Sequence, residues 1–346
     1  MAFSSMQYTV KGDGPSALCL MLFEREVAIF MATYTIVPER KTLHGQFSRD
    51  FPPVLTIDSG DTVIYRTLDA GWNLEPRGST SAGERPRKFA PRIKGRDDGH
   101  ALCGPIALRG AQPGMTLVVH IQEVRPGTWG WNSAGGWASP VNTRLHLAEV
   151  EERFHLWTLD ADAMSGRNQD GYQLQLRPFM GVMGMPPDEP GLHPSWPPRI
   201  WGGNLDCKEL ITGSTLYLPI PVPLALFSVG DGHAVQADGE VSSTAIECPM
   251  ERVELKFELD ETGILGAPWA NTPAGWITLG FHEDLHEASM LALDAMLTLM
   301  GHLYGLTRQD AVALASLVVD LHITQLVNAG VRGVHAILPH GALAWA

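Results

Sequence analysis

The chain has 346 residues, of which 45% are hydrophobic and 18% are charged, a balance typical of a globular protein with a sizeable core. Its 38 acidic residues outnumber its 25 basic ones and give a net charge of −13, which argues against nucleic acid as a partner because phosphate binding requires a basic face. The 25 prolines and 36 glycines predict many turns, and therefore many short strands.

Residues 1–30 differ in character from the rest of the chain. Their apolar pieces are interrupted by Glu24, Arg25 and Glu26, so no stretch reaches the roughly 20 residues that a membrane span requires. The charges also fall inside any core of a signal peptide. We therefore expect no membrane association. We interpret residues 1–30 as an N-terminal extension, for which a mis-assigned start is one explanation, and residues 31–346 as a single domain.

Short strand patterns dominate residues 32–280. The segments 54–58 and 62–67 flank a Ser-Gly-Asp turn, and this spacing predicts a β-hairpin. Further strand patterns cover residues 116–124, 153–159, 172–176, 214–218, 252–259 and 275–279. The intervening segments 126–140 and 178–201 contain tryptophans that could close a small apolar pocket. Many short strands with Gly and Pro turns are typical of a sandwich or a barrel.

The pattern changes to helical spacing near residue 284. Apolar residues recur every three to four positions from Asp284 to Tyr304, and Gly305 suits a C-cap. Thr307 suits the N-cap of a second helix that we expect to run to about Val327. The predicted fold is mainly β, with a β-sandwich-like core of many short strands and a C-terminal α-helical pair packed on it.

Four cysteines lie far apart, at positions 19, 103, 207 and 248. None forms a C-x-x-C pair, so a zinc knuckle or a redox motif is excluded. We therefore expect reduced thiols and a cytoplasmic location. We interpret Cys207 as a core residue.

The densest group of polar residues lies within residues 201–247. The residues in question are Asn204, Asp206, Asp231, His233, Gln236, Asp238 and Glu240, which stand among glycines. An uncharged, apolar run from Gly213 to Val229 separates the first two from the others. Gly230-Asp231-Gly232 by itself suits a hairpin turn. A turn, however, does not need the neighbouring His, Gln and Glu, so the pattern predicts a functional site built on a rigid sheet.

Seven sequence blocks resemble the acetamidase/formamidase family and occur in its order between residues 44 and 340. They are Phe51–Val63, Gly99–Gly114, Gly202–Asp206, Gly213–Leu216, Gly230–Glu240, Asp320–Gln325 and Gly333–Pro339. The resemblance implies a catalytic domain that hydrolyses short aliphatic amides to a carboxylate and ammonia, in a homo-oligomer. The chain departs from the family pattern after His100, with Ala-Leu-Cys, and at Ala237, where Gly is common. These departures bear on substrate preference.

The chemistry implied by this resemblance suggests roles for the polar residues. A divalent metal ion, with zinc as our choice, would activate water and would be bound by Asp206, His233 and His100. Glu240 would act as the base, with His233 and Asp231 also in the catalytic set. Asn204 and Gln236 would hydrogen-bond the small-molecule amide.

Two alternatives belong to other functional classes. His282-Glu283-Asp-Leu-His286 matches the H-E-x-x-H motif of zinc peptidases. Because it directly follows strand residues 275–280, His282 is expected to precede the helix, and the two histidines would then not share a face. The other alternative is a non-catalytic β-sandwich binding module that uses the ten tryptophans as stacking platforms.

Overall fold

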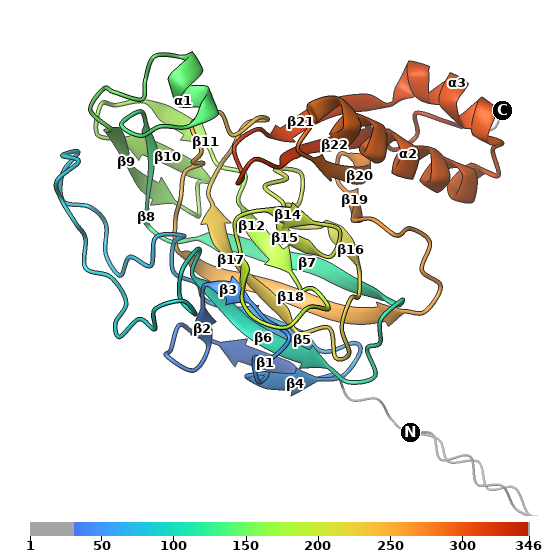
Figure 1. Ribbon diagram of the computed structural model, residues 1–346, viewed down its shortest axis with the longest axis horizontal. Helices are drawn as coiled ribbons and strands as arrows, with labels where there is room; N and C mark the ends of the chain where they lie inside the picture. The colour runs from blue at the N-terminus through green and yellow to red at the C-terminus, as the bar shows by residue number, and fades with distance from the viewer. Residues whose placement is uncertain (1–30, 345–346) are drawn as a thin grey trace, which may run out of the picture. The chain divides into compact units, whose positions relative to one another are not determined.

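Two large sheets form the body of the protein in the computed structural model, which describes residues 31–344 (Figure 1). The extension predicted for residues 1–30 lies outside the described residues. The first sheet has nine strands, in the order β1 (Thr33–Ile36), β5 (Thr62–Tyr65), β18 (Met250–Asp260), β7 (Thr116–Pro126), β16 (Thr215–Pro219), β19 (Trp269–Thr272), β20 (Gly275–His282), β22 (Arg332–Leu338) and β21 (Asp320–Gln325).

The second sheet has seven strands and carries Asn204, Asp231 and His233 of the polar residues noted above. Its order is β14 (Pro198–Arg199), β15 (Gly202–Asn204), β12 (Phe179–Gly184), β17 (Phe227–His233), β6 (Leu102–Leu108) and β2 (Leu43–His44), with β4 (Leu55–Ile57) also paired to β6. Two smaller sheets consist of β11 (Gln173–Gln175), β10 (Ser165–Asn168), β9 (Arg153–Asp160) and β8 (Trp129–Ala134), and of β13 (His193–Pro194) with β3 (Gln46–Phe47).

Alternation of side chains along β18 shows why the large sheets pack face to face. Val253, Leu255 and Phe257 are buried, whereas the charged residues between them lie on the other face. The ring of Phe257 meets that of Phe227 on β17 edge to face, with 5.2 Å between centroids. A contact between strands of different sheets places the main core between the two sheets. The predicted mainly β, sandwich-like fold is confirmed.

Three helices are present among the described residues: α1 (Pro140–Arg144), α2 (Leu285–Tyr304) and α3 (Arg308–Val318). Helix α2 packs on β20 so closely that a side chain on Gly280 would meet the carbonyl oxygen of Ala288 at 2.2 Å. Gly305 ends α2 in the left-handed conformation and Thr307 caps α3, as predicted. Within residues 31–344, no single helix is long and apolar enough to cross a membrane; α2 and α3 satisfy that test only together, across a bend of 107°.

Two details of the prediction are wrong. The segments 54–58 and 62–67 do not form a hairpin, because β4 pairs with β6 in one sheet and β5 pairs with β1 and β18 in the other. Local alternation of apolar and polar residues predicts where strands occur, but it does not predict which strands pair. The second helix ends at Val318 instead of Val327, because the chain continues from Asp320 as β21 and pairs with β22.

Candidate active site

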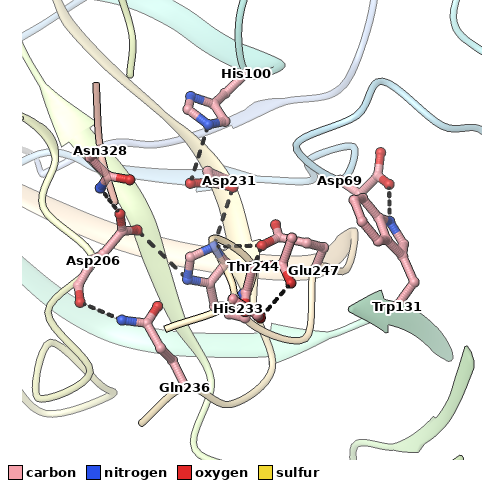
Figure 2. Close-up of polar contacts among 12 residues, drawn as sticks. Asp69, His100, Trp131, Asp206, Asp231, His233, Gln236, Thr244, Glu247 and Asn328 are labelled. Carbon is pink, nitrogen blue, oxygen red and sulfur yellow. Dashed lines mark hydrogen bonds and ion pairs between the residues drawn. The ribbon is translucent and has the colours of Figure 1, made fainter. Parts of the chain in front are cut away.

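Five buried side chains that can ionise meet at one place in the seven-stranded sheet. They are Asp206, Asp231, His233, Glu240 and Glu247, and each is less than 10% exposed. We call them the buried cluster; Figure 2 shows Asp206, Asp231 and Glu247 around the ring of His233. His233 Nε2 lies 3.3 Å from a carboxylate oxygen of Asp231 and 3.4 Å from one of Glu247. Its Nδ1 lies 3.8 Å from Asp206 Oδ1.

Strand β17 supplies Asp231 and His233, which are two residues apart and so share a face. The Gly-Asp-Gly sequence here is therefore part of a strand and not a hairpin turn. Glycine is required on both sides of Asp231, because a Cβ on Gly230 would meet the carbonyl oxygen of Ala101 at 2.3 Å and one on Gly232 would meet that of Cys248 at 2.7 Å.

Gly181 on β12 leaves room for the carboxylates. A Cβ at this position would lie 2.6 Å from Asp206 Oδ1, 2.6 Å from Asp231 Oδ2 and 2.9 Å from a ring carbon of His233. The two carboxylates and the imidazole can therefore approach the backbone of β12 more closely than any side chain at residue 181 would allow.

Three acids of the cluster have a left-handed backbone, with φ of 48° at Asp206, 60° at Asp231 and 44° at Glu240. This conformation is unfavourable for residues other than Gly and collects at functional sites, at a cost of roughly 1–3 kcal/mol each. The surrounding fold holds all three in place, which indicates that the direction of their carboxylates matters.

Asp206 is anchored from two sides. Its carboxylate Oδ2 accepts a hydrogen bond from Nδ2 of Asn328, which follows β21 near the C-terminus. Its backbone carbonyl accepts one from Nε2 of Gln236 at 2.8 Å. The C-terminal segment therefore completes a site whose other residues lie between positions 181 and 247.

Burial and neighbouring charges shift the pKa values of the cluster in opposite directions. Burial raises the pKa of Asp206 and of Glu247 to about 7, and it raises that of Glu240 well above its usual range. Burial alone would also raise the pKa of Asp231, but His100 and His233 lower it below its usual value. Burial disfavours the charged form of His233, yet Glu247 and Asp231 together raise its pKa.

The arrangement offers two overlapping sets of donor atoms for a metal ion. Asp206, His233 and Glu240 form one set, and Asp231, His233 and Glu247 form the other; within each set the ligand atoms lie within 4.8 Å of one another. Several of these atoms are buried without a hydrogen-bond partner among the described residues: Asp206 Oδ1, His233 Nδ1, Glu240 Oε2 and Glu247 Oε2. Buried His and carboxylate groups that could bind a metal ion are thus present.

The remaining predicted residues lie around this cluster. His100 contacts it at the edge: its Nε2 is 4.0 Å from Asp231 Oδ2, its Nδ1 is 3.0 Å from Ser195 Oγ, and it belongs to neither donor set. Asn204 is buried at the end of β15, opposite Val182. Both Asn204 Oδ1 and Gln236 Oε1 are buried acceptors without a partner among the described residues.

Three residues of the site were not identified from the sequence: Gly181, Glu247 and Asn328. Glu247 follows a Ser- and Thr-rich stretch and pairs through isolated β-bridges with both Trp131 and His233. Nothing in the local pattern distinguishes Gly181 or Asn328 from ordinary strand and loop residues, so only their spatial position reveals them. Asp238, although close in sequence, points elsewhere and pairs with Lys208 at 2.7 Å and with His322 at 2.9 Å.

The zinc-peptidase motif does not assemble. His282 is the last residue of β20, whereas His286 lies in the first turn of α2. Between them, Asp284 is the helix N-cap and accepts from the backbone N–H groups of His286 and Glu287. The acidic residues here serve the start of the helix.

Comparison with known proteins agrees with the sequence blocks. The family model described as the Acetamidase/Formamidase family matches residues 32–196 and 193–272. The chain belongs to this family. A Schizosaccharomyces pombe protein provisionally named a formamidase is 26% identical over 280 residues, which cover 65% of this chain and 66% of that protein. An acetamidase of Mycolicibacterium smegmatis is 26% identical over 258 residues, covering 58% of this chain and 61% of the relative.

The alignments thus span slightly less than two thirds of these relatives. Among solved structures, the acetamidase of Yersinia enterocolitica has a similar fold, with a TM-score of 0.77, 24% identity and coverage of 91% of this chain and 94% of that one. The matched family region ends at residue 272, so Asn328 lies beyond it. The fold of this part is still shared, since the structural match covers most of both chains.

Proposed function

We propose that this protein hydrolyses short aliphatic amides to a carboxylate and ammonia, and that the buried cluster is its active site. The supporting observation is the convergence of four buried carboxylates and one buried histidine, which Gly181 allows by its lack of a side chain. Membership of the acetamidase/formamidase family supports the same reaction. Water would add to the acyl carbon, the C–N bond would break, and the nitrogen would leave with a proton.

A divalent metal ion fits this site. If all four carboxylates were ionised, the buried charge would be strongly negative, and a buried uncompensated charge is costly. A divalent cation would supply that compensation, would polarise the amide carbonyl and would lower the pKa of a bound water. Mixed His and carboxylate donors suit zinc. Asp206 and His233 are our choice for its ligands, with His100 or Glu247 as the further donor.

The side chains then have distinct tasks. Glu240 acts as general base and carries the water proton to the leaving nitrogen, and its raised pKa suits that exchange. His233 and Asp231 hold the polar network at the reacting centre. Asn204 Oδ1 and Gln236 Oε1, both buried acceptors without a partner among residues 31–344, suit the two N–H groups of a primary amide.

The experiment compares Asp206→Ala and His233→Ala with the wild type in ammonia release from formamide, acetamide and propionamide, with metal analysis of each sample. Both variants are expected to lose turnover and bound metal. His286→Ala is the matched control, because that exposed histidine belongs to α2, outside the cluster. Full metal content and a near-normal rate in both cluster variants would show that the site lies elsewhere. No ammonia from any amide would favour the non-catalytic binding module.

We also propose a homo-oligomer in the cytoplasm. Exposed apolar side chains on and after the C-terminal helices support association: Leu291 is 47% exposed, Leu317 is 78% and Leu321 is 46%. Among the described residues, Cys103, Cys207 and Cys248 are unpaired thiols, which suits a reducing compartment. Light scattering that gives the 37.7 kDa mass of one chain would exclude the oligomer.

A further inference from the structure

A cavity of about 370 Å³ lies between the loop of residues 71–88 and strand β8. Three cationic side chains line it, those of Arg77, Arg85 and Lys88, against a single carboxylate, that of Glu152. Trp131 and Trp137 also line the cavity. In a protein with a net charge of −13, this concentration of positive charge in one cavity is unusual.

The cations of this cavity are not neutralised by the described part of the chain. No carboxylate among residues 31–344 lies within 4.0 Å of Arg77, Arg85 or Lys88; the one ion pair in this loop joins Arg87 to Glu75. Glu152 accepts a hydrogen bond from Ser133 Oγ at 2.9 Å.

The geometry of Arg77 is held in place without an anion. Its guanidinium lies over the ring of Phe154, 3.8 Å from the centroid, and donates to the carbonyl oxygens of Ser81 and Glu84. Its Nε is buried and has no partner among the described residues. Lys88 lines the cavity and remains exposed to solvent. Partial desolvation lowers its pKa, Asp69 opposes that change, and the nearby arginines lower it further. An anion entering the cavity would relieve this repulsion.

The cavity adjoins the buried cluster through one of its lining residues, Trp131. Trp131 exchanges backbone hydrogen bonds with Glu247 at 2.9 and 2.8 Å, and Glu247 in turn forms a β-bridge with His233. Neighbouring extended segments lie about 4.8 Å apart, so two such steps separate Trp131 from His233 by roughly 10 Å. Figure 2 shows the Trp131–Asp69 hydrogen bond on the Glu247 side of the cluster.

We propose that this cavity is a subsite for a carboxylate carried by the amide substrate. The proposal rests on the proposed amide hydrolysis and adds a substrate class to it: monoamides of short dicarboxylic acids. In such a substrate the amide lies at the cluster, and the distal carboxylate reaches the cations through the acyl chain. The reaction is unchanged, because water replaces ammonia at the amide carbon and the distal carboxylate takes no part.

The first experiment measures kcat/KM for succinamate, glutaramate and adipamate beside the neutral isostere succinamide. The wild type is expected to prefer at least one of the anionic amides over succinamide by tenfold or more. Lys88→Gln and Arg85→Gln are expected to reduce that ratio about tenfold, mainly through KM. Lys94→Gln, at an exposed lysine outside the lining, is the matched control and should keep the ratio. Equal use of anionic and neutral amides by the wild type, with no effect of Lys88→Gln, would overturn the subsite.

The second experiment measures binding of succinate by calorimetry and needs no turnover. Binding to the wild type and to Lys94→Gln, with loss in Lys88→Gln, is the expected result. If succinate binds in this way but no amide is hydrolysed, the proposed reaction is wrong while the carboxylate site stands. A third result is that succinate binds and alters acetamide turnover while succinamate is not preferred over succinamide. The cavity would then bind a carboxylate that is not part of the substrate, and the proposed substrate class would be wrong.

Discussion

Gly181 lies in the interior of β12, where a residue without a side chain normally weakens a strand. Its φ is not in the left-handed region, so the backbone itself would accept alanine. The obstacle is local, because a Cβ would come within 2.6 Å of the carboxylates of Asp206 and Asp231. At this position the requirement for glycine comes from the cluster and not from the backbone.

We therefore expect Gly181→Ala to fold but to lose bound metal and at least about 100-fold in turnover. That loss is of the size typical for a disturbed catalytic geometry. Metal analysis, ammonia release and melting temperature are the measurements. Gly266→Ala is the matched control, since nothing lies within 4 Å of the Cβ position there. A Gly181→Ala enzyme with normal activity would mean that the space beside Asp206 is not used.

The two buried glutamates differ in their surroundings, and this difference separates their roles. Glu247 accepts from the backbone N–H of Ala245 and lies against His233, whereas Glu240 Oε2 has no partner among the described residues. We expect Glu240→Gln to keep the fold and the metal but to lose about 10²–10⁴-fold in rate, as for a lost general base. Single-turnover kinetics with metal analysis tests this. A large loss in Glu247→Gln beside a loss below about threefold in Glu240→Gln would transfer the role of base to Glu247.

At the scale of elements, β21 connects the C-terminal part to the loop that carries Glu240. Gly239 donates its N–H to the carbonyl oxygen of Thr324 at 3.1 Å and accepts from Leu326 at 3.1 Å. Asn328 then reaches the carboxylate of Asp206. Strand β21 and the segment that follows it therefore support the site as well as form the edge of the nine-stranded sheet.

We expect Asn328→Ala to weaken metal binding about 10–100-fold, which is typical when a residue that orients a metal ligand is lost. The affinity is measured by competition with a chelator, and the pH profile of kcat/KM is recorded in parallel, because removal of this donor raises the pKa of Asp206. Asn271→Ala on β19, outside the cluster, serves as control. If metal affinity and pH profile are both unchanged, Asn328 is only a structural contact.

For the molecule as a whole, buried histidines couple stability to pH. His44 is 1% exposed; its Nδ1 donates to the carbonyl oxygen of Gln46 at 2.7 Å and its Nε2 lies 3.0 Å from Ser228 Oγ. Burial lowers the pKa of His44 to about 4, below the value of about 6.5 expected in the unfolded chain. Because the unfolded state takes up the proton first, stability is complete above pH 6.5 and is lost as the pH falls from 6.5 towards 4.

We expect His44 alone to remove about 2 kcal/mol of the unfolding free energy between pH 7 and pH 5. Urea unfolding at both pH values measures it in the wild type and in His44→Gln, whose loss over this range should be smaller by that amount. His146→Gln changes an exposed histidine and should keep the wild-type dependence. Equal pH dependence in all three proteins would show that His44 is not buried in its neutral form.

What the sequence determined by itself was the class of fold and most of the polar residues. Alternation along β18, the caps at Thr307 and Gly305, and the glycine-rich blocks around Asp206 and His233 are local patterns, so they can be recognised without coordinates. The tertiary structure decided which strands pair and which residues complete the site. Glu247 and Asn328 lie 41 and 122 positions from Asp206, and Gly181 contributes only an absent side chain. Contacts between distant segments depend on how two sheets and a C-terminal strand pack together. Neither the periodicity of the sequence nor the type of a residue predicts that packing.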